Sequence, residues 1–476
     1  MGDSDYASNP TPVPGTTLTK LFFTAIDRFG GAPAFGRITP SEEVQEFAYV
    51  EILARVQVVS AALDACGLER GDRVAILSEN RLEWALTDFG CLCNGLVDVP
   101  VYPSLTAQHI AYILRDCRAK LVFVPDTSRM ARVVEARAAS GATFEIVVFD
   151  PPESLPEGVV GWEAFLARGA DVAAGTGQKE FRARALQAKT DDVATILYTS
   201  GTTGDPKGVM LTHGNVGSNV EACHMALDVG HEDVTVSFLP LSHILQRMVD
   251  YLFFSAGCKI VHARSMLTAA DDMRLARPTV AVAVPRFYEK VHAAVMEVGG
   301  PKRVVVRWAV AVADRVAGIR LAGGTPSGLL ALQFALADRL VFSKVRAAVG
   351  GRIRFFVSGS APLAPELNRF FYSIGMVILE GYGLTETSPV TNVNTAKDFR
   401  IGTVGKAVAG TEVRIAEDGE ILIRGPQVMR GYYNRPEDTA EAVEADGWFH
   451  TGDVGELDAD GFLRITDRKK DLIFTA

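Results

Sequence analysis

Cysteine, long apolar runs and clustered positive charge are all scarce in this sequence. Only six cysteines occur in 476 residues, which is too few for a disulfide framework. No Cys and His spacing completes a metal site, so we expect free, buried thiols in a reducing cytoplasm. No stretch approaches the roughly 18 consecutive apolar residues of a membrane span. Residues 1–17 are polar and proline-rich, unlike a signal peptide, and are predicted to be a disordered lead-in.

The charge balance argues against nucleic acid as a partner. The formal net charge is −9, and the densest basic cluster is the short run Arg468-Lys469-Lys470. Phosphate backbones need a clustered excess of Lys and Arg. A hydrophobic content of 48% and a charged content of 22% are typical of a soluble globular protein. Peripheral contact with the inner face of a membrane and a homodimer are both left open.

Short apolar runs alternate with segments of helical period from Arg73 onward, and a second such series begins at Val193. This alternation predicts parallel sheets covered by helices on both faces. After about Asn394, alternating strands and the turns Asp418-Gly419 and Asp460-Gly461 predict hairpins. We therefore expect an α/β protein, with two doubly wound subdomains followed by a small β-barrel. The expected limits are 18–190 and 191–393 for the α/β subdomains, 394–466 for the barrel and 467–476 for a hinge.

Two other segments have a predicted role in the fold. The polar, alanine-rich stretch 168–190 is interpreted as a connection between the subdomains. The segment 301–349 is rich in Ala, Leu, Val and Arg, and its apolar residues recur at helical spacing. It is predicted to be helical and to pack against a sheet.

The strongest local signal runs from Tyr198 to Gly208, Tyr-Thr-Ser-Gly-Thr-Thr-Gly-Asp-Pro-Lys-Gly, between a predicted strand and a helix predicted to begin near Thr212. Glycines let backbone N–H groups form an anion nest, hydroxyls add donors, and a lysine adds a mobile positive charge. It is not a Walker A loop, because Lys207 is followed by Gly208 and Val209. The pattern predicts a polyphosphate site formed by Thr199, Ser200, Gly201, Thr202, Thr203, Gly204 and Lys207.

A second glycine-rich motif, Gly381-Tyr-Gly-Leu-Thr-Glu-Thr387, follows a strand predicted to end at Glu380. An aromatic ring beside close backbone can stack on adenine, and a carboxylate can hold a hard cation that bridges phosphates. The alternative is a partial dinucleotide-binding motif, but its third glycine is absent.

These motifs occur in order with four others and together resemble the adenylate-forming superfamily, which includes acyl-CoA synthetases, luciferases and peptide-synthetase adenylation domains. The others are Leu239–His243, Ser358–Leu363, Trp448–Asp453 and Asp467–Lys470. The resemblance covers the chain from about Leu18 onward. It implies an adenine site at Gly359, Ser360, Ala361, Gly381, Tyr382 and Gly383, an α-phosphate contact at Thr385, and Mg²⁺ at Glu386 and Thr199. It also implies a ribose contact at Asp453 with Arg468, a catalytic group at His243, a catalytic Lys207 and a domain hinge at Lys470.

Some of these residues have ordinary alternatives when taken alone. His243 is more often a structural residue, Asp453 a turn former and Arg468 a solvated charge. Likewise, the segment 358–363 could be a plain strand-to-helix turn.

Three segments, Val284–Val291, Ala335–Lys344 and Phe356–Ser360, resemble long-chain fatty acyl-CoA synthetases of the bacterial type. The resemblance implies an acid–thiol ligase that uses ATP, Mg²⁺, CoA and a long-chain fatty acid. The residues that could form an acyl tunnel are equally good core residues: Leu245, Met248, Tyr251, Leu252, Phe253, Phe254, Phe355 and Phe356. A fatty acyl-AMP ligase that feeds a carrier protein is a close alternative.

The sequence ends within an apolar, strand-like run, Asp471–Ala476. We interpret this as an engineered truncation that removes the C-terminal domain of the family, which carries a catalytic lysine. The resulting expectation is a chain that binds ATP and fatty acid but turns them over poorly, so a non-catalytic binding module is a further alternative.

Overall fold

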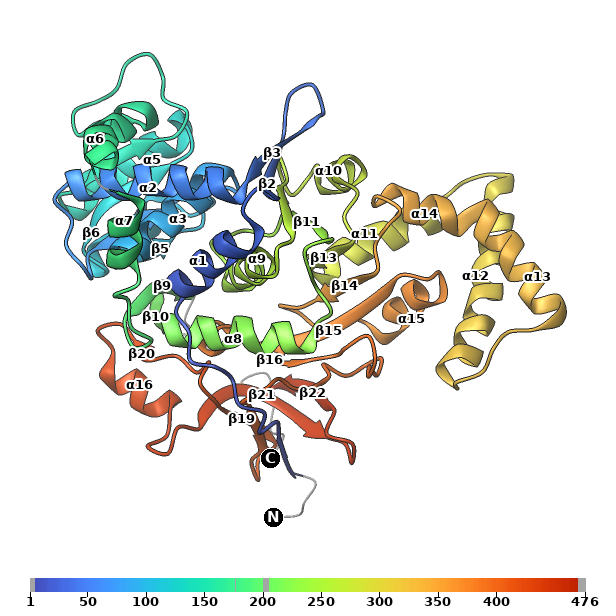
Figure 1. The fold of residues 1–476 in the computed structure, drawn as a ribbon. Coiled ribbons are helices and arrows are strands. Elements are labelled where there is room, and N and C mark those ends of the chain that lie inside the picture. The colour runs from blue at the N-terminus through green and yellow to red at the C-terminus, as the bar shows by residue number, and fades with distance from the viewer. Residues whose placement is uncertain (1–4, 176, 200–204, 470–476) are drawn as a thin grey trace.

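The computed structural model describes residues 5–175, 177–199 and 205–469 (Figure 1). The expected α/β class is confirmed, because four sheets alternate with helices along the chain. The six cysteines are free, as expected. No helix within the described ranges is long and apolar enough to cross a membrane.

The largest sheet has eight strands in the order β20-β10-β9-β5-β4-β6-β7-β8. The strands from β9 to β8 run parallel, and their residues are buried and mostly apolar, as a sheet covered on both faces requires. The strands are β4 (Arg73–Ile76), β5 (Val97–Pro100), β6 (Ala119–Val124), β7 (Glu145–Val148), β8 (Val159–Gly161), β9 (Val193–Thr199), β10 (Lys207–Thr212) and β20 (Gly431–Tyr432). The helices between them are α2 (Tyr49–Ala65), α3 (Leu82–Asn94), α4 (Ala107–Asp116), α5 (Thr127–Ser140), α6 (Trp162–Gly175) and α7 (Gln178–Ala185).

The structure adds detail to two predictions in this region. The helix predicted to begin near Thr212 is confirmed as α8 (His213–Ala226), with Thr212 as its N-cap, and the unpredicted strand β10 precedes it and pairs antiparallel with β9, with Lys207 opposite Thr199. The stretch 168–190 is mostly helical, because α6 and α7 occupy it and Phe181 and Ala185 of α7 are buried.

The remaining α/β part contains two smaller sheets. One is β13-β14-β15-β16-β17, and the other is β11-β12-β2-β3. Strand pairing crosses the expected limit near residue 190, because β2 pairs with β12 while β9 and β10 join the first sheet. The strands are β2 (Pro33–Ile38), β3 (Val44–Ala48), β11 (Val234–Ser237), β12 (Lys259–His262), β13 (Val280–Ala283), β14 (Phe355–Ser358), β15 (Val377–Gly383), β16 (Val390–Val393) and β17 (Lys406–Ala407). The helices are α1 (Leu18–Phe29), α8, α9 (Ile244–Ala256), α10 (Ala269–Ala276), α11 (Pro285–Met296) and α15 (Pro365–Ser373).

The segment 301–349 is helical as predicted, but most of it does not pack against a sheet. It forms α12 (Pro301–Leu321), α13 (Gly328–Ala337), the π-helical turn η2 (Asp338–Phe342) and α14 (Ser343–Ala348). Helix α12 packs against α15 and α13, while α13 lies at the edge of the molecule (Figure 1). We call residues 301–349 the helical arm.

The C-terminal strands form a five-stranded sheet, β1-β18-β19-β21-β22, which does not close into the expected barrel by strand pairing. The segment 404–410 connects its two edges instead: Val404 N–H donates to Leu463 O at 2.9 Å, and Gly410 N–H donates to Asn9 O at 2.8 Å. Both predicted hairpins are confirmed. The elements are β1 (Tyr6–Ser8), β18 (Glu412–Ile415), β19 (Glu420–Arg424), α16 (Pro436–Ala442), β21 (Phe449–Leu457) and β22 (Leu463–Arg468).

The lead-in was predicted to be disordered, but β1 within it is ordered. Residues 6–8 pair with β18, and the Tyr6 hydroxyl donates to Glu412. The edge of β18 offers unpaired backbone groups, and the short strand satisfies them.

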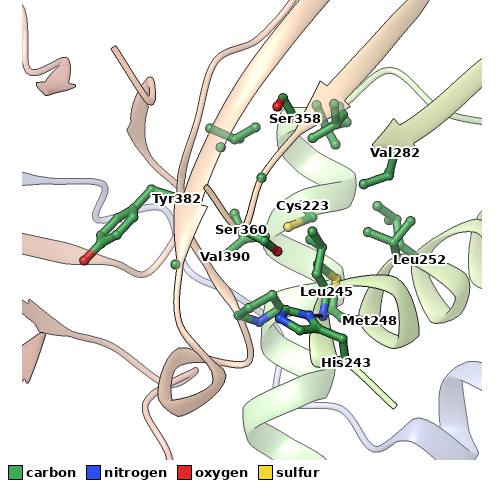
Figure 2. Close-up of a pocket in the computed structure, with 18 of the residues that line it drawn as sticks. Cys223, His243, Leu245, Met248, Leu252, Val282, Ser358, Ser360, Tyr382 and Val390 are labelled. Carbon is green, nitrogen blue, oxygen red and sulfur yellow. Dashed lines mark hydrogen bonds between the residues drawn. The ribbon is translucent and has the colours of Figure 1, made fainter. Parts of the chain in front are cut away.

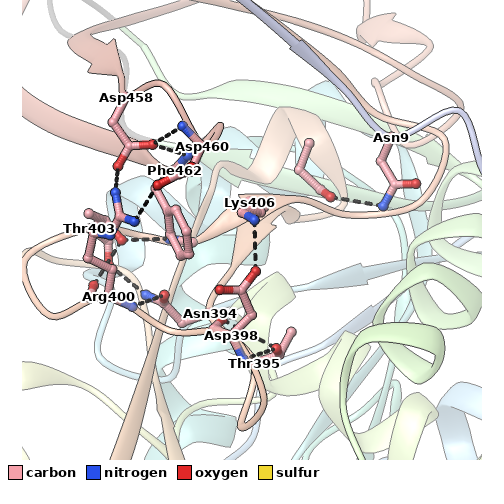
Figure 3. A network of polar contacts seen from close by, with 12 residues as sticks. Asn9, Asn394, Thr395, Asp398, Arg400, Thr403, Lys406, Asp458, Asp460 and Phe462 are labelled. Carbon is pink, nitrogen blue, oxygen red and sulfur yellow. Dashed lines mark hydrogen bonds and ion pairs between the residues drawn. The ribbon is translucent and has the colours of Figure 1, made fainter. Parts of the chain in front are cut away.

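A polar network holds the β21–β22 hairpin against the segment that follows β16 (Figure 3). The Arg400 guanidinium contacts both Asp458 and Asp460 in the hairpin turn and lies 4.4 Å from the Phe462 ring centroid. Lys406 lies over the same ring, with its Nζ 4.7 Å from the centroid. The network fixes the small sheet, and with it the candidate site residues Asp453 and Arg468 of β21 and β22, against β15 and β16.

Candidate active site

A cavity of about 360 Å³ lies between the loops that follow β14 and β15 and the helices α8 and α9 (Figure 2). These loops come from the carboxyl ends of β14 and β15, which pair in parallel, and ligands commonly bind at this edge of an open α/β sheet. The cavity brings together most of the predicted site residues that the structure describes: Thr199, His243, Gly359, Ser360, Gly381, Tyr382, Gly383, Thr385, Glu386 and Arg468.

Some predicted residues do not line the cavity or cannot be placed. Ala361 is exposed on the loop after β14 and is not part of the wall, and Asp453 lies behind Tyr382. The predictions for Ser200, Gly201, Thr202, Thr203, Gly204 and Lys470 fall outside the described residues.

Lys207 also stands outside the cavity wall, because an acidic residue holds it. Its Nζ donates to Asp438 Oδ1 at 2.7 Å and lies 5.2 Å from the centroid of the Tyr432 ring. The Tyr432 hydroxyl in turn donates to Glu386 Oε1 at 2.9 Å. Lys207 is thus separated from Glu386 by one aromatic side chain. Sequence reasoning missed Tyr432 and Asp438, since neither belongs to a recognised motif.

Glu386 is the carboxylate at the polar end of the cavity. It lies in the short helix η3 (Thr385–Thr387), and the backbone N–H of Met429 donates to its carbonyl at 2.7 Å. Burial raises the pKa of Glu386, because a charged carboxylate loses hydration there. A cation bound to the Glu386 carboxylate would compensate for the lost hydration.

The oxygen donors in this part of the cavity fit a hard cation. Glu386 offers a carboxylate and Thr199 a hydroxyl. No cluster of three or more His, Cys, Asp or Glu ligands occurs in the part of the chain that the structure describes. Mg²⁺ does not require such a cluster, because it commonly binds through one or two carboxylates together with substrate phosphates and water.

Tyr382, Asp453 and Arg468 form a chain of contacts between β15 and the small sheet. The Tyr382 hydroxyl donates to Asp453 Oδ2 at 2.7 Å, and Arg468 Nε lies 3.3 Å from Asp453 Oδ1. The strand register places Asp453 directly opposite Arg468. Burial and the neighbouring Asp453 charge raise the pKa of Tyr382, so it remains a hydroxyl donor. The prediction that β15 ends at Glu380 was wrong, because Gly381 and Tyr382 continue it and pair with β16.

The other end of the cavity is apolar. Helix α9 contributes Leu245, Met248, Val249, Leu252 and Phe253, and the strands β13 and β14 contribute Val282 and Phe355. Three tunnel candidates lie elsewhere: Tyr251 binds Asp88, Phe254 packs in the core against Phe22 and Tyr49, and Phe356 packs against Tyr288. Fewer of the candidate tunnel residues therefore line the apolar end than the sequence suggested.

His243 stands where the polar and apolar ends meet (Figure 2). It is the N-cap of α9, and its Nδ1 accepts a hydrogen bond from the Leu245 backbone N–H at 3.1 Å. Burial lowers the pKa of His243, so its imidazole is neutral near pH 7. His243 can therefore have both of the roles considered from the sequence, because it caps a helix and also lines the cavity.

The opposite face of α9 carries polar side chains that contact one another. Arg247 lies between Asp88 of α3 and Asp98 of β5, with both N···O distances 2.6 Å, and its Nη1 donates to Thr195 Oγ1 of β9 at 2.7 Å. The Tyr251 hydroxyl donates to Asp88 Oδ2 at 2.6 Å. These contacts fix the helix, and hence the wall of the cavity, to the large sheet.

The model of the AMP-binding enzyme family matches residues 22–433. The chain belongs to this family. The match includes the β9–β10 hairpin, the loops after β14 and β15, and both ends of the cavity, while Asp453 and Arg468 follow it.

This AMP-binding enzyme is similar in sequence to several ligases. It is 37% identical to the long-chain-fatty-acid–CoA ligase FadD15 of Mycobacterium bovis, over 90% of this chain and 70% of the relative. It is 32% identical to long chain acyl-CoA synthetase 1 of Arabidopsis thaliana, over 96% of this chain and 72% of the relative. Among solved structures, ATP-bound MatB from Rhodopseudomonas palustris is similar at 27% identity and a TM-score of 0.72, over 97% of this chain and 80% of that one.

The fold of this AMP-binding enzyme also matches the N-terminal domain of FACL13 from Mycobacterium tuberculosis. The TM-score is 0.71 at 24% identity, and the match covers 95% of this chain and 99% of that one. The α/β fold expected from the sequence is therefore shared with this N-terminal domain.

Proposed function

We propose that this chain activates a long-chain fatty acid with ATP and passes the acyl group to coenzyme A. One observation carries the proposal: a single cavity is polar at Thr199, Thr385 and Glu386, and apolar along α9 and Phe355. A fatty acid that is to react with a nucleotide needs both environments within the length of one molecule. The ligases that the relatives are named for provide independent support.

The first step would join the acid to AMP. A carboxylate oxygen attacks the α-phosphorus of ATP, a new P–O bond forms, and the bond to the departing pyrophosphate breaks. Thr385 is proposed to donate a hydrogen bond to the α-phosphate, because its hydroxyl lines the polar end. Mg²⁺ bound to Glu386 and Thr199 would neutralise phosphate charge.

The nucleoside would lie between Tyr382 and the loop after β14. The Tyr382 ring, Gly359, Ser360, Gly381 and Gly383 are proposed to contact adenine. Asp453 has acceptor capacity beyond its bonds to Tyr382 and Arg468, which suits a ribose diol. Lys207 would have to leave Asp438 to reach a phosphate.

The second step would transfer the acyl group. The thiolate of coenzyme A attacks the acyl carbon, a thioester forms, and the C–O bond to AMP breaks, so that AMP leaves. The acyl-phosphate anhydride makes this possible, because AMP is a far better leaving group than an oxide. The neutral imidazole of His243 is proposed to orient the acyl group that reacts by hydrogen bonding to it.

A change in acyl-length preference tests the apolar end. Met248→Trp fills space along α9, so we expect it to exclude the distal part of a long chain. Each methylene that loses an apolar pocket costs about 0.8 kcal/mol, so three lost methylenes should lower kcat/KM for palmitate by on the order of 50-fold. The value for octanoate should change little.

The matched control is Met225→Trp, which places the same bulk on an exposed position of α8. Pyrophosphate release and acyl-CoA formation would be measured over a series of saturated acids. An unchanged length profile in Met248→Trp would contradict the position of the acyl chain. Accumulation of acyl-AMP without thioester when CoA is present would instead identify a fatty acyl-AMP ligase.

A further inference from the structure

The outer face of the helical arm carries a row of exposed leucines. Leu329, Leu332, Leu336 and Leu340 follow one another at spacings of three or four residues, and they are 72%, 71%, 51% and 41% exposed. Helices α13, η2 and α14 follow one another without a break, so this spacing places the four side chains on one face. We call them the leucine stripe. Single exposed apolar residues are common on protein surfaces, whereas a contiguous row of them marks an interaction site.

The composition of α13 is unusual for a helix at the surface. No charged residue occurs between Gly323 and Ala337. Its inner face packs within the arm, where Phe334 contacts Phe342 and lies under the Arg320 guanidinium at 5.0 Å. An ordinary surface helix would present polar residues on the face opposite these contacts.

The charge of the arm is opposite to that of the whole chain. Residues 301–349 contain eight Lys or Arg residues and two Asp residues, a formal charge of +6, while the whole chain carries −9. The positive charges flank the uncharged segment rather than interrupting it, with Arg315 and Arg320 before it and Arg339 and Lys344 after it. An apolar face bordered by cations is complementary to a surface that has anionic groups on the outside and an apolar layer beneath them.

The apolar surface continues from the leucine stripe into a groove of about 740 Å³ at the base of the arm. Leu340 belongs to both, and the groove is lined mainly by apolar residues of α10, α11, α12 and α14. Lys290, Lys302 and Lys344 line it too, and none of them has an ion-pair partner among residues 5–175, 177–199 and 205–469. Leu267 at its edge is 89% exposed.

We propose that the helical arm docks this protein on the surface of an anionic lipid bilayer. The leucine stripe enters the boundary between headgroups and acyl chains, and the lysines and arginines around it contact the anionic headgroups. Lysines at the groove can extend their ammonium groups to the interface while their methylenes stay on apolar surface. The charge of the arm and the exposure of its leucines do not depend on the proposed function. The choice of a lipid surface over an acidic protein does rest on that function, because long-chain fatty acids partition into bilayers.

Vesicle co-sedimentation with Leu332→Glu/Leu336→Glu tests the proposal. The wild type should bind vesicles of phosphatidylcholine and phosphatidylglycerol at about 3:1 and bind pure phosphatidylcholine much less, and high salt should weaken the binding. The double variant should bind the anionic vesicles at least about tenfold less. The matched control is Val50→Glu/Val172→Glu, which adds the same charge at exposed apolar positions on α2 and α6 and should bind as the wild type does.

Two further readouts separate the alternatives. Thermal unfolding checks that both double variants are folded, and pyrophosphate release with octanoate tests the proposed reaction without a membrane. Loss of vesicle binding in the leucine variant alone supports docking, even if no acid is activated. Unchanged vesicle binding overturns the proposal. So does a fall in mass from dimer to monomer without a change in vesicle binding, which would make the stripe an interface between two copies.

Discussion

Arg247 holds the helix that forms one wall of the candidate active-site cavity, and replacing it tests that role. The side chain is 1% exposed and lies between the carboxylates of Asp88 and Asp98. It also donates to the hydroxyl oxygens of Thr195 and Tyr251, at 2.7 and 2.9 Å. The change Arg247→Met keeps much of the apolar stem but removes the charge and every donor.

The expected loss of stability is large. Removing one partner of a buried ion pair costs about 3–5 kcal/mol, because the remaining charge is left without compensation. Two carboxylates share Arg247 here, so we expect about 5 kcal/mol at pH 7 for the variant. Replacing a buried ion pair entirely with neutral groups is often close to neutral. The triple variant Asp88→Asn/Asp98→Asn/Arg247→Met should therefore recover most of the loss.

The loss should also depend on pH. Burial raises the pKa of Asp98, and the Arg247 charge opposes that rise. Without Arg247 the pKa of Asp98 rises further, so the native state holds a proton that the unfolded state releases above about pH 4. Stability conferred by that proton is present at low pH and is lost as the pH rises toward the folded-state pKa. The variant should consequently be closer to the wild type at pH 5 than at pH 8.

Urea unfolding followed by tryptophan fluorescence measures both effects. Trp84 is a suitable reporter, because the Arg247 guanidinium lies 5.7 Å from its ring centroid. A loss below about 1 kcal/mol, or a loss equal at pH 5 and pH 8, would show that the pair does not hold α9 as described. The triple variant serves as the control, since it should show little of the pH dependence.

Two further changes test the polar end. Glu386→Gln should weaken binding of Mg²⁺–ATP at least about tenfold in calorimetric titration, because the charged cation ligand is lost. The variant should keep its stability, because burial already penalises the charged carboxylate. Unchanged affinity would remove Glu386 from the site. Tyr382→Phe removes a hydrogen bond to the Asp453 carboxylate, and a hydrogen bond to a charged group is worth about 1.5–3 kcal/mol in general. The change should raise the KM for ATP by about tenfold while the KM for the acid stays the same. Equal effects on both substrates would indicate a general loss of folding.

Local sequence patterns predicted the parts of the protein that depend on local chemistry. Strands β4 and β6 were found because a sheet buried on both faces needs continuous apolar runs. The motif residues around Tyr382 and His243 were found because their spacing matches a family. Their convergence on one cavity followed from the fold, because parallel strands bring their carboxyl ends to one edge.

The missed features depend on contacts between distant segments. Strand β10 was missed because it pairs with β9, which precedes the glycine-rich segment, and nothing within its own six residues marks it as a strand. Strand β1 is three residues long and exists because β18 offers an edge some 400 residues away in the sequence. Tyr432 and Asp438 reach the site from the segment after β19, so no local motif marks them.

Helix α9 shows why the apolar end of the site depends on a charge network outside it. A helix that is surrounded by protein needs partners within the protein for its buried polar side chains. On one face of α9, Gln246, Arg247, Asp250 and Tyr251 bond with one another or with Asp88, Thr195 and Ser237. Only then can the opposite face be apolar and free of competing charges. The network beneath α9 is accordingly a condition for the proposed acyl cavity beside the proposed nucleotide site, although none of its members lines the cavity.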